Sequence, residues 1–180
     1  MLNNFNNKFS QQAIESVCLA RTDLWMVKNF FEPAVLEDIL NRLESETDWH
    51  LENGQEHLPR KVLRWTVGSL LWDIRGYLNT LDFSKFGLKF LNVSIWKDSA
   101  GFTIPEHADQ DGVIAAMQIY LNDIPQNLGT WFEEVEVPFV KNTGYIMKNT
   151  NSPRHGMKAT VPDATTRYSL YARFDLINPQ

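Results

Sequence analysis

The sequence is poor in cysteine, since Cys18 is the only one among its 180 residues. A single thiol cannot close a disulfide within the chain, and it cannot supply the several thiolates of a structural zinc site. The first ten residues are polar and Asn-rich, without the apolar segment of a secretion signal. We therefore expect a protein of a reducing compartment, the cytoplasm.

Long hydrophobic runs and basic clusters are absent as well. No uninterrupted apolar stretch approaches the roughly 20 residues that a membrane-spanning helix needs, so we expect a soluble protein. The formal net charge is −5, and the Lys and Arg residues are scattered. This disfavours nucleic acid as a partner, because duplex binding normally needs a basic patch. Hydrophobic residues make up 43% of the chain, enough for the core of one domain spanning residues 1–180.

Residues 1–85 are expected to form a mixed, partly helical support. Pro33 suits the first turn of a helix, and apolar residues recur with helical spacing from Ala34 to Leu43. The same spacing predicts a second helix from Leu70 to Leu81. An apolar segment at Leu24–Val27 predicts a short strand before them.

The polar segment from Glu46 to Arg60 contains Gly54 and predicts a loop. Two of the four histidines, His50 and His57, lie in it. Histidines of polar loops are most often solvated side chains, so neither receives a functional role.

From about residue 86 onward, short runs of β-branched and aromatic residues alternate with turn clusters. This rhythm is typical of a sandwich or jelly roll. We therefore expect a mainly β protein with some helix, in which a sandwich or jelly-roll core over residues 86–180 is braced by the N-terminal helices. The expected strands are Phe90–Trp96, Gly101–His107, Val113–Leu121, Gly129–Val135, Gly144–Lys148, His155–Lys158 and Tyr168–Phe174.

His107 and Asp109 are the first candidate metal ligands. In a strand, their i, i+2 spacing puts both side chains on one face, about 7 Å apart at the backbone. A third ligand must come from a distant segment, and His155 is the obvious candidate because the β half contains no other histidine. Two imidazoles and one carboxylate make the facial triad of non-haem Fe(II) enzymes, which leaves positions open for a bidentate co-substrate and dioxygen.

Arg167 and Ser169 lie on one face of an expected strand, beyond His155. A guanidinium binds a carboxylate through two parallel hydrogen bonds, and a nearby hydroxyl adds a third donor. The pair therefore suits the distal carboxylate of a dicarboxylic keto acid. A structural ion pair between Arg167 and a nearby carboxylate is the competing interpretation.

Six short motifs follow one another in the second half of the chain: Pro105–Asp109, Tyr120–Asn122, Gly129–Phe132, Gly144–Tyr145, His155–Gly156 and Arg167–Leu170. Their order resembles that of the 2-oxoglutarate/Fe(II)-dependent dioxygenase superfamily, and most of all its prolyl-hydroxylase-like branch. The resemblance covers roughly residues 90–175. It implies a double-stranded β-helix (jelly-roll) core over residues 86–180, Fe(II) bound by His107, Asp109 and His155, and 2-oxoglutarate and O2 as co-substrates. It further implies that Arg167 binds the distal carboxylate of 2-oxoglutarate, with Ser169 as hydroxyl partner and Tyr120 as a further donor.

The sequence departs from the family pattern in places. Animal-type prolyl hydroxylases usually have Lys where Arg167 stands, although many relatives have Arg. The aromatic hydroxyl often found before the glycine turn is missing, because Trp96, Lys97 and Asp98 occupy that stretch. We therefore expect a co-substrate pocket that is built differently. Arg167 and Arg173 resemble the arginine pair of nucleic-acid dealkylases, but the Asn-x-Tyr element of those enzymes is not in place.

The sequence thus predicts an Fe(II)- and 2-oxoglutarate-dependent oxygenase that hydroxylates a peptide side chain or a small metabolite. A non-catalytic jelly-roll binding module, in which His107 and His155 are ordinary half-buried histidines, is the first alternative. A nucleic-acid dealkylase of the same superfamily is the second. A cupin-type metal enzyme that uses no keto acid is the third, although such sites normally use more imidazoles.

Overall fold

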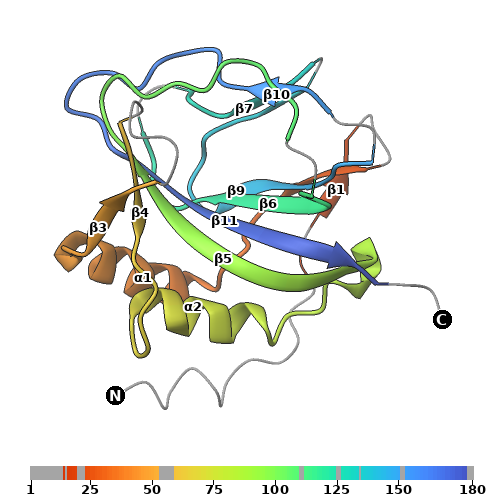
Figure 1. Cartoon of the computed structure of the whole chain (residues 1–180), viewed down its shortest axis with the longest axis horizontal. Helices are drawn as coiled ribbons and strands as arrows, with labels where there is room; N and C mark the ends of the chain where they lie inside the picture. The colour runs from red at the N-terminus through yellow and green to blue at the C-terminus, as the bar shows by residue number, and fades with distance from the viewer. Residues whose placement is uncertain are drawn as a thin grey trace.

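A computed structural model describes residues 14, 16–19, 23–52, 59–109, 112–124, 127–133, 135–150 and 153–177. In this part of the chain an eight-stranded antiparallel sheet faces a three-stranded one, and two helices cover the outer face of the larger sheet (Figure 1). The predicted architecture, a mainly β jelly roll braced by N-terminal helices, is confirmed.

The large sheet has the strand order β1-β2-β9-β6-β11-β5-β4-β3, and the small sheet has the order β10-β7-β8. The helices are α1 (Pro33–Ser45), α2 (Leu70–Leu78) and the short 3-10 helix η1 (Ser84–Phe86). The strands are β1 (Ser16–Cys18), β2 (Leu24–Val27), β3 (Trp49–Leu51), β4 (Arg60–Leu63), β5 (Leu88–Asp98), β6 (Ala115–Tyr120), β7 (Thr130–Phe132), β8 (Val135–Val137), β9 (Thr143–Lys148), β10 (His155–Gly156) and β11 (Arg167–Leu176).

The central strands of the large sheet have two different faces. Ile95 of β5, Leu170 of β11 and Ile119 of β6 are fully buried against the helices. Ser169 of β11 is paired with Trp96 of β5 on one side and with Tyr120 of β6 on the other. Because successive side chains of a strand alternate, this second row points away from the helices, towards the small sheet. The candidate site lies on that face.

Both predicted helices are present. Pro33 is in the first turn of α1, whose buried side chains Val35, Leu36, Ile39 and Leu43 form the predicted apolar stripe. Helix α2 is capped by Ser69, whose hydroxyl accepts a hydrogen bond from Trp72 N. It ends at Leu78, before the predicted Leu81. No helix in the described part of the chain is long and apolar enough to cross a membrane.

Three local predictions were wrong. The expected single strand Gly129–Val135 is divided between β7 and β8, which pair antiparallel as a hairpin. The segment from Gly101 to His107 is not a regular strand: Phe102 and Ile104, two residues apart, bond to Val161 and Met157, four residues apart, so an even ladder cannot form. The polar segment from Glu46 to Arg60 is not all loop, because it contains β3 and the first residue of β4. Strand β3 pairs with the rest of β4, from Lys61 to Leu63. Their short length leaves little periodic signal.

The two histidines of that segment differ. His50 lies on β3, where Nε2 is 2.6 Å from Asp48 Oδ1 and Nδ1 is 3.2 Å from Arg64 Nη2. His57 lies outside the described residues.

Asn142, in the turn before β9, ties that turn to the segment that precedes α1. Its Oδ1 accepts a hydrogen bond from Phe31 N at 2.8 Å, and its Nδ2 donates one to Phe31 O at 2.8 Å. Its φ of 62° is in the left-handed region, which Asn tolerates better than most residues. The side chain of Asn142 thus bonds to both backbone polar groups of Phe31, as a neighbouring strand would.

We predict that Asn142→Ala lowers the free energy of unfolding by about 2–3 kcal/mol, because two hydrogen bonds are lost and Ala disfavours a positive φ. Urea denaturation followed by tryptophan fluorescence measures this. The matched control is Asn142→Gly, which loses the same bonds but accepts the backbone conformation, so it should be less destabilised by about 1 kcal/mol. Wild-type stability in Asn142→Ala would contradict this role.

Candidate functional site

His107, Asp109 and His155 come together in the structure, with their ligand atoms all within 4.8 Å of one another. Oδ1 of Asp109 is 3.9 Å from Nε2 of His107 and 3.7 Å from Nε2 of His155. The two histidines are brought side by side by a backbone bridge, in which each N–H donates to the other residue's carbonyl at 2.9 and 2.8 Å. The three predicted ligands therefore meet at one point, although His107 and Asp109 lie on a bridge and a loop instead of a regular strand.

The hydrogen bonds of the two imidazoles orient both rings. Nδ1 of His107 is 3.1 Å from Pro105 O, and Nδ1 of His155 is 2.9 Å from Pro153 O. Because a carbonyl only accepts, Nδ1 carries the hydrogen and Nε2 presents a lone pair towards Asp109. Burial lowers the pKa of His155, against the opposing effect of the Pro153 hydrogen bond. The lowered pKa favours the neutral ring, which metal binding requires, and the hydrogen bond to Pro153 O holds that ring in its orientation.

Asp109 supplies an independent test of whether a metal fits. Its Oδ2 is buried and makes no hydrogen bond to any residue that the structure describes. A buried carboxylate oxygen without a partner is unfavourable, and a bound cation removes that cost. Two imidazole nitrogens and a carboxylate are a donor set that suits Fe(II). The three residues therefore fit a divalent transition metal.

Gly156 allows the two halves of this site to approach each other. A Cβ at this position would lie 2.9 Å from both Glu106 N and Ile104 O, closer than real Cβ atoms come to backbone. Any side chain here would push the segment before His107 away from β10. The glycine after His155 is therefore a steric requirement of the site.

A cavity of about 310 Å³ opens beside the three residues. Its other polar and aromatic lining comes from six strands and from the segment after β3: Glu52, Arg60, Trp96, Gln118, Thr130, Tyr145, Arg167, Tyr171 and Arg173. Trp96 and Tyr171 are stacked with ring centroids 4.3 Å apart, so they form a flat aromatic side of the cavity. Burial raises the pKa of Tyr145 and of Tyr171, so both phenols keep their protons.

Arg167 lines the cavity and is also part of an ion pair. Its Nη1 donates to Asp98 Oδ2 at 2.6 Å. Oδ1 of Asp98 also accepts a hydrogen bond from Arg60 Nε at 2.6 Å, and Oδ2 accepts one from Arg60 Nη2 at 3.0 Å. The structural ion pair of the competing interpretation is thus present. Nε of Arg167 is nevertheless buried without a hydrogen-bond partner among the described residues, so part of the guanidinium remains available to a ligand.

Ser169 and Tyr120 are close to Arg167 in the fold but do not line the cavity. Both are fully buried: Ser169 Oγ accepts from Gln118 Nε2 at 3.0 Å, and Tyr120 OH donates to Thr130 Oγ1 at 2.8 Å. Gln118 and Thr130 stand between them and the cavity. The predicted hydroxyl donors therefore support the residues that face the cavity.

Sequence reasoning missed several of the cavity residues. A signal was available for Gln118, because a lone amide within the apolar run of β6 suggests a polar partner on one face. Asp98 came just after the predicted strand Phe90–Trp96, and its pairing with Arg167 follows from strand register, which the sequence does not give. For Arg60 and Glu52, at the edges of a polar segment, no local signal exists.

No protein-family model and no curated protein matches this sequence. Solved structures do match. A prolyl hydroxylase from Trichoplax adhaerens, in complex with a hypoxia-inducible-factor peptide, has a TM-score of 0.65 at 12% identity, over 89% of each chain. HygX from Streptomyces hygroscopicus, with nickel and 2-oxoglutarate bound, has a TM-score of 0.64 at 12% identity, over 87% of this chain and 84% of HygX.

A prolyl-4-hydroxylase from Pseudomonas putida has a TM-score of 0.59 at 14% identity, over 86% of this chain and 92% of the hydroxylase. Identities this low carry information on the fold and not on the activity. The chain has the jelly-roll fold of these oxygenases.

Proposed function

We propose that the protein is an Fe(II)- and 2-oxoglutarate-dependent oxygenase of the prolyl-hydroxylase-like branch, which hydroxylates a peptide side chain or a small metabolite. One observation carries the proposal: two imidazoles and a carboxylate with an unpartnered buried oxygen converge at a cavity that also contains an incompletely bonded arginine. The fold and the order of the motifs support the same conclusion.

His107, Asp109 and His155 would hold the iron, each through the atom that faces the common centre. Bound iron, together with 2-oxoglutarate and dioxygen, would oxidise a substrate C–H bond, with release of succinate and carbon dioxide. The carbonyls of Pro105 and Pro153 keep the two imidazoles in the required orientation and tautomer.

Arg167 would bind the distal carboxylate of 2-oxoglutarate through the part of its guanidinium that Asp98 does not occupy. Gln118 and Tyr145 offer polar groups in the same cavity, and Tyr145 OH donates to Gln118 Oε1 at 3.0 Å. The stacked rings of Trp96 and Tyr171 would exclude water from one side.

The substrate class follows only in outline. The Trichoplax enzyme was captured with a peptide, and HygX with hygromycin B. We infer that the present cavity takes a peptide side chain or a small metabolite, and the net charge of −5 gives no support for nucleic acid.

A non-catalytic binding module is the second candidate, because the Arg167–Asp98 ion pair is what a purely structural arginine would make. A structural module and an oxygenase differ in whether the cavity binds metal and keto acid together. The next experiment separates them.

We predict that anaerobic addition of Fe(II) and 2-oxoglutarate to the apoprotein produces the visible charge-transfer band of a chelated keto acid. Asp109→Ala should abolish the band, because one of three ligands is lost. Arg167→Ala should keep iron binding but raise the dissociation constant (Kd) of 2-oxoglutarate about 10- to 100-fold, through loss of a charge-assisted pair.

The matched control is Arg173→Ala, which removes a cavity-lining arginine that lies further along β11 and should change this Kd less. Folding of each variant is checked by circular dichroism. A correctly folded wild-type protein that gives no band would exclude the oxygenase and favour the binding module.

We predict that Gly156→Ala raises the Kd of Fe(II) about 10- to 100-fold, because the added methyl displaces the backbone that precedes His107. Anaerobic calorimetry measures this affinity. Gly76→Ala is the control: its Cβ would meet nothing within 4 Å, and it lies within α2, away from the metal site. An unchanged Kd in Gly156→Ala would show that the close approach is not needed for metal binding.

A further inference from the structure

Arg60, Asp98 and Arg167 form one row across three neighbouring strands. The register pairs Asp98 of β5 with Arg60 of β4 on one side and with Arg167 of β11 on the other. Oδ2 of Asp98 accepts hydrogen bonds from both guanidinium groups, and Oδ1 accepts a second one from Arg60. The three side chains are at most 2% exposed, so water screens these charges weakly.

The row matters for any anion that binds to Arg167. A lone Asp98 beside Arg167 would cancel its positive charge and would repel an incoming carboxylate. Arg60 balances the charge of Asp98 from the opposite side. Arg167 can then hold Asp98 and still attract a second carboxylate.

Arg60 is fixed in this position by its neighbours. Its guanidinium carbon lies 3.9 Å from the centroid of Trp96 and 4.2 Å from that of Phe102, so the group is stacked between two rings. Trp96 in turn stacks on Tyr171. The arginine is therefore held rigidly next to the aromatic side of the cavity.

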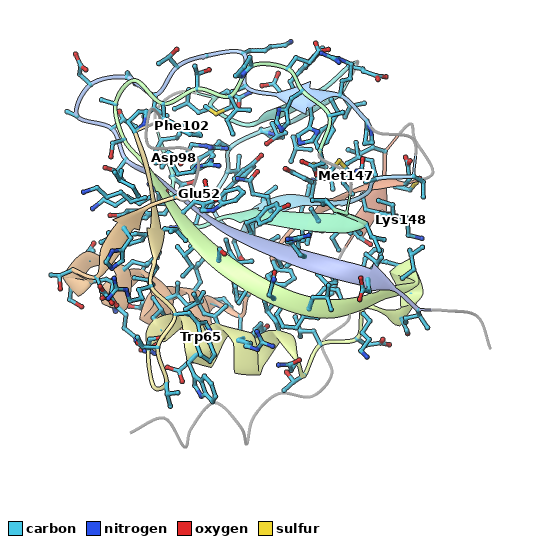
Figure 2. The ribbon with its side chains drawn as sticks, viewed as in Figure 1. Glu52, Trp65, Asp98, Phe102, Met147 and Lys148 are labelled. Atoms are coloured by element: carbon cyan, nitrogen blue, oxygen red, sulfur yellow. The ribbon has the colours of Figure 1, made fainter. Side chains whose placement is uncertain are left out.

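Glu52 adds a fourth charge at the other end of the row. Its Oε2 is 3.9 Å from Nη1 of Arg60, and its carboxyl group also interacts with the side chain of Trp96. Figure 2 shows Glu52, Asp98 and Phe102 gathered where β5 ends, on the side of the large sheet away from the helices. Burial raises the pKa of Glu52, against the opposing effect of Arg60. In its ionised form, Glu52 offsets part of the charge of Arg60, because the two groups are only 3.9 Å apart.

We propose that Arg60 and Glu52 are positioning residues that set, through Asp98, how strongly Arg167 binds the distal carboxylate of 2-oxoglutarate. Arg60 strengthens this binding and Glu52 weakens it. The inference rests on the proposed function and extends it, because both residues belong to the segment around β3 and β4, which precedes the predicted jelly-roll core. The N-terminal half of the chain then helps to select the co-substrate.

The experiment compares two keto acids in anaerobic Fe(II) titrations: 2-oxoglutarate, and 2-oxopentanoate, which has a methyl group in place of the distal carboxylate. The affinity ratio of the two ligands measures recognition of that carboxylate alone. Arg60→Met, which keeps an unbranched side chain but removes its charge, should weaken the binding of 2-oxoglutarate about tenfold and leave the binding of 2-oxopentanoate unchanged. Glu52→Gln should tighten the binding of 2-oxoglutarate about two- to fivefold. The effect is smaller than that of Arg60→Met, because the carboxylate of Glu52 is partly exposed and therefore screened by water.

If the role of Arg60 is purely structural, Arg60→Met would weaken the binding of both keto acids equally, or would lower the melting temperature without changing the affinity ratio of the two ligands. Glu52→Gln, at a partly exposed position, decides the question if Arg60→Met does not fold. An unchanged ratio in a folded Arg60→Met or in Glu52→Gln, with a normal wild-type band, would overturn this inference and leave the proposed function intact. Absence of any band in the wild-type protein would overturn both.

Discussion

The carboxylate of Asp98 is the constraint on which the arrangement of the pocket depends. A fully buried negative charge is tolerated only where opposite charges and hydrogen bonds surround it, and two guanidinium groups meet that need here. Since Arg60, Asp98 and Arg167 belong to β4, β5 and β11, their bonding also fixes these strands relative to one another. The orientation of Arg167 towards the cavity, and the stacking of Arg60 on Trp96, both follow from it.

Because side chains alternate along each strand, one face of the large sheet forms the apolar core and the other face carries the polar residues of the site. On the helix side the central strands contribute Ile95, Leu170 and Ile119, which bury apolar surface against α1 and α2. On the other side the same strands carry polar residues such as Gln118 and Arg167. A register slip of one residue would exchange the two faces, so the apolar core also specifies the position of the polar groups.

The sequence predicted the architecture well because its signals are periodic or local. The apolar stripe of α1 and the turn-separated strands each show within a short window. The candidate ligands were found through residue chemistry: the β half contains two histidines, and both reach Asp109. Their spacing on a regular strand was the weaker part of that argument, because irregular pairing around Ile104 interrupts the strand.

The pocket beyond these ligands could not be predicted, because it depends on strand register. Nothing local indicates that Arg60 and Arg167, more than a hundred positions apart, share one carboxylate. Ser169 and Tyr120 were assigned from motif positions, and one further layer of side chains, Gln118 and Thr130, separates them from the cavity. Motifs locate a residue on a strand, whereas the packing of its neighbours decides whether it reaches the ligand.

The distribution of unsatisfied polar atoms argues that the cavity is built for a polar ligand. Among the described residues, the buried side-chain atoms that lack a close hydrogen-bond partner include Asp109 Oδ2 and Arg167 Nε, which both belong to cavity residues. Each such atom costs about 1–3 kcal/mol, so a fold selected for stability alone would not collect them in one place. They include donors and acceptors, which suits a metal ion together with a dianionic keto acid and a substrate that carries polar groups of its own. Burying these polar groups costs the fold free energy, and a ligand that bonds to them recovers it on binding.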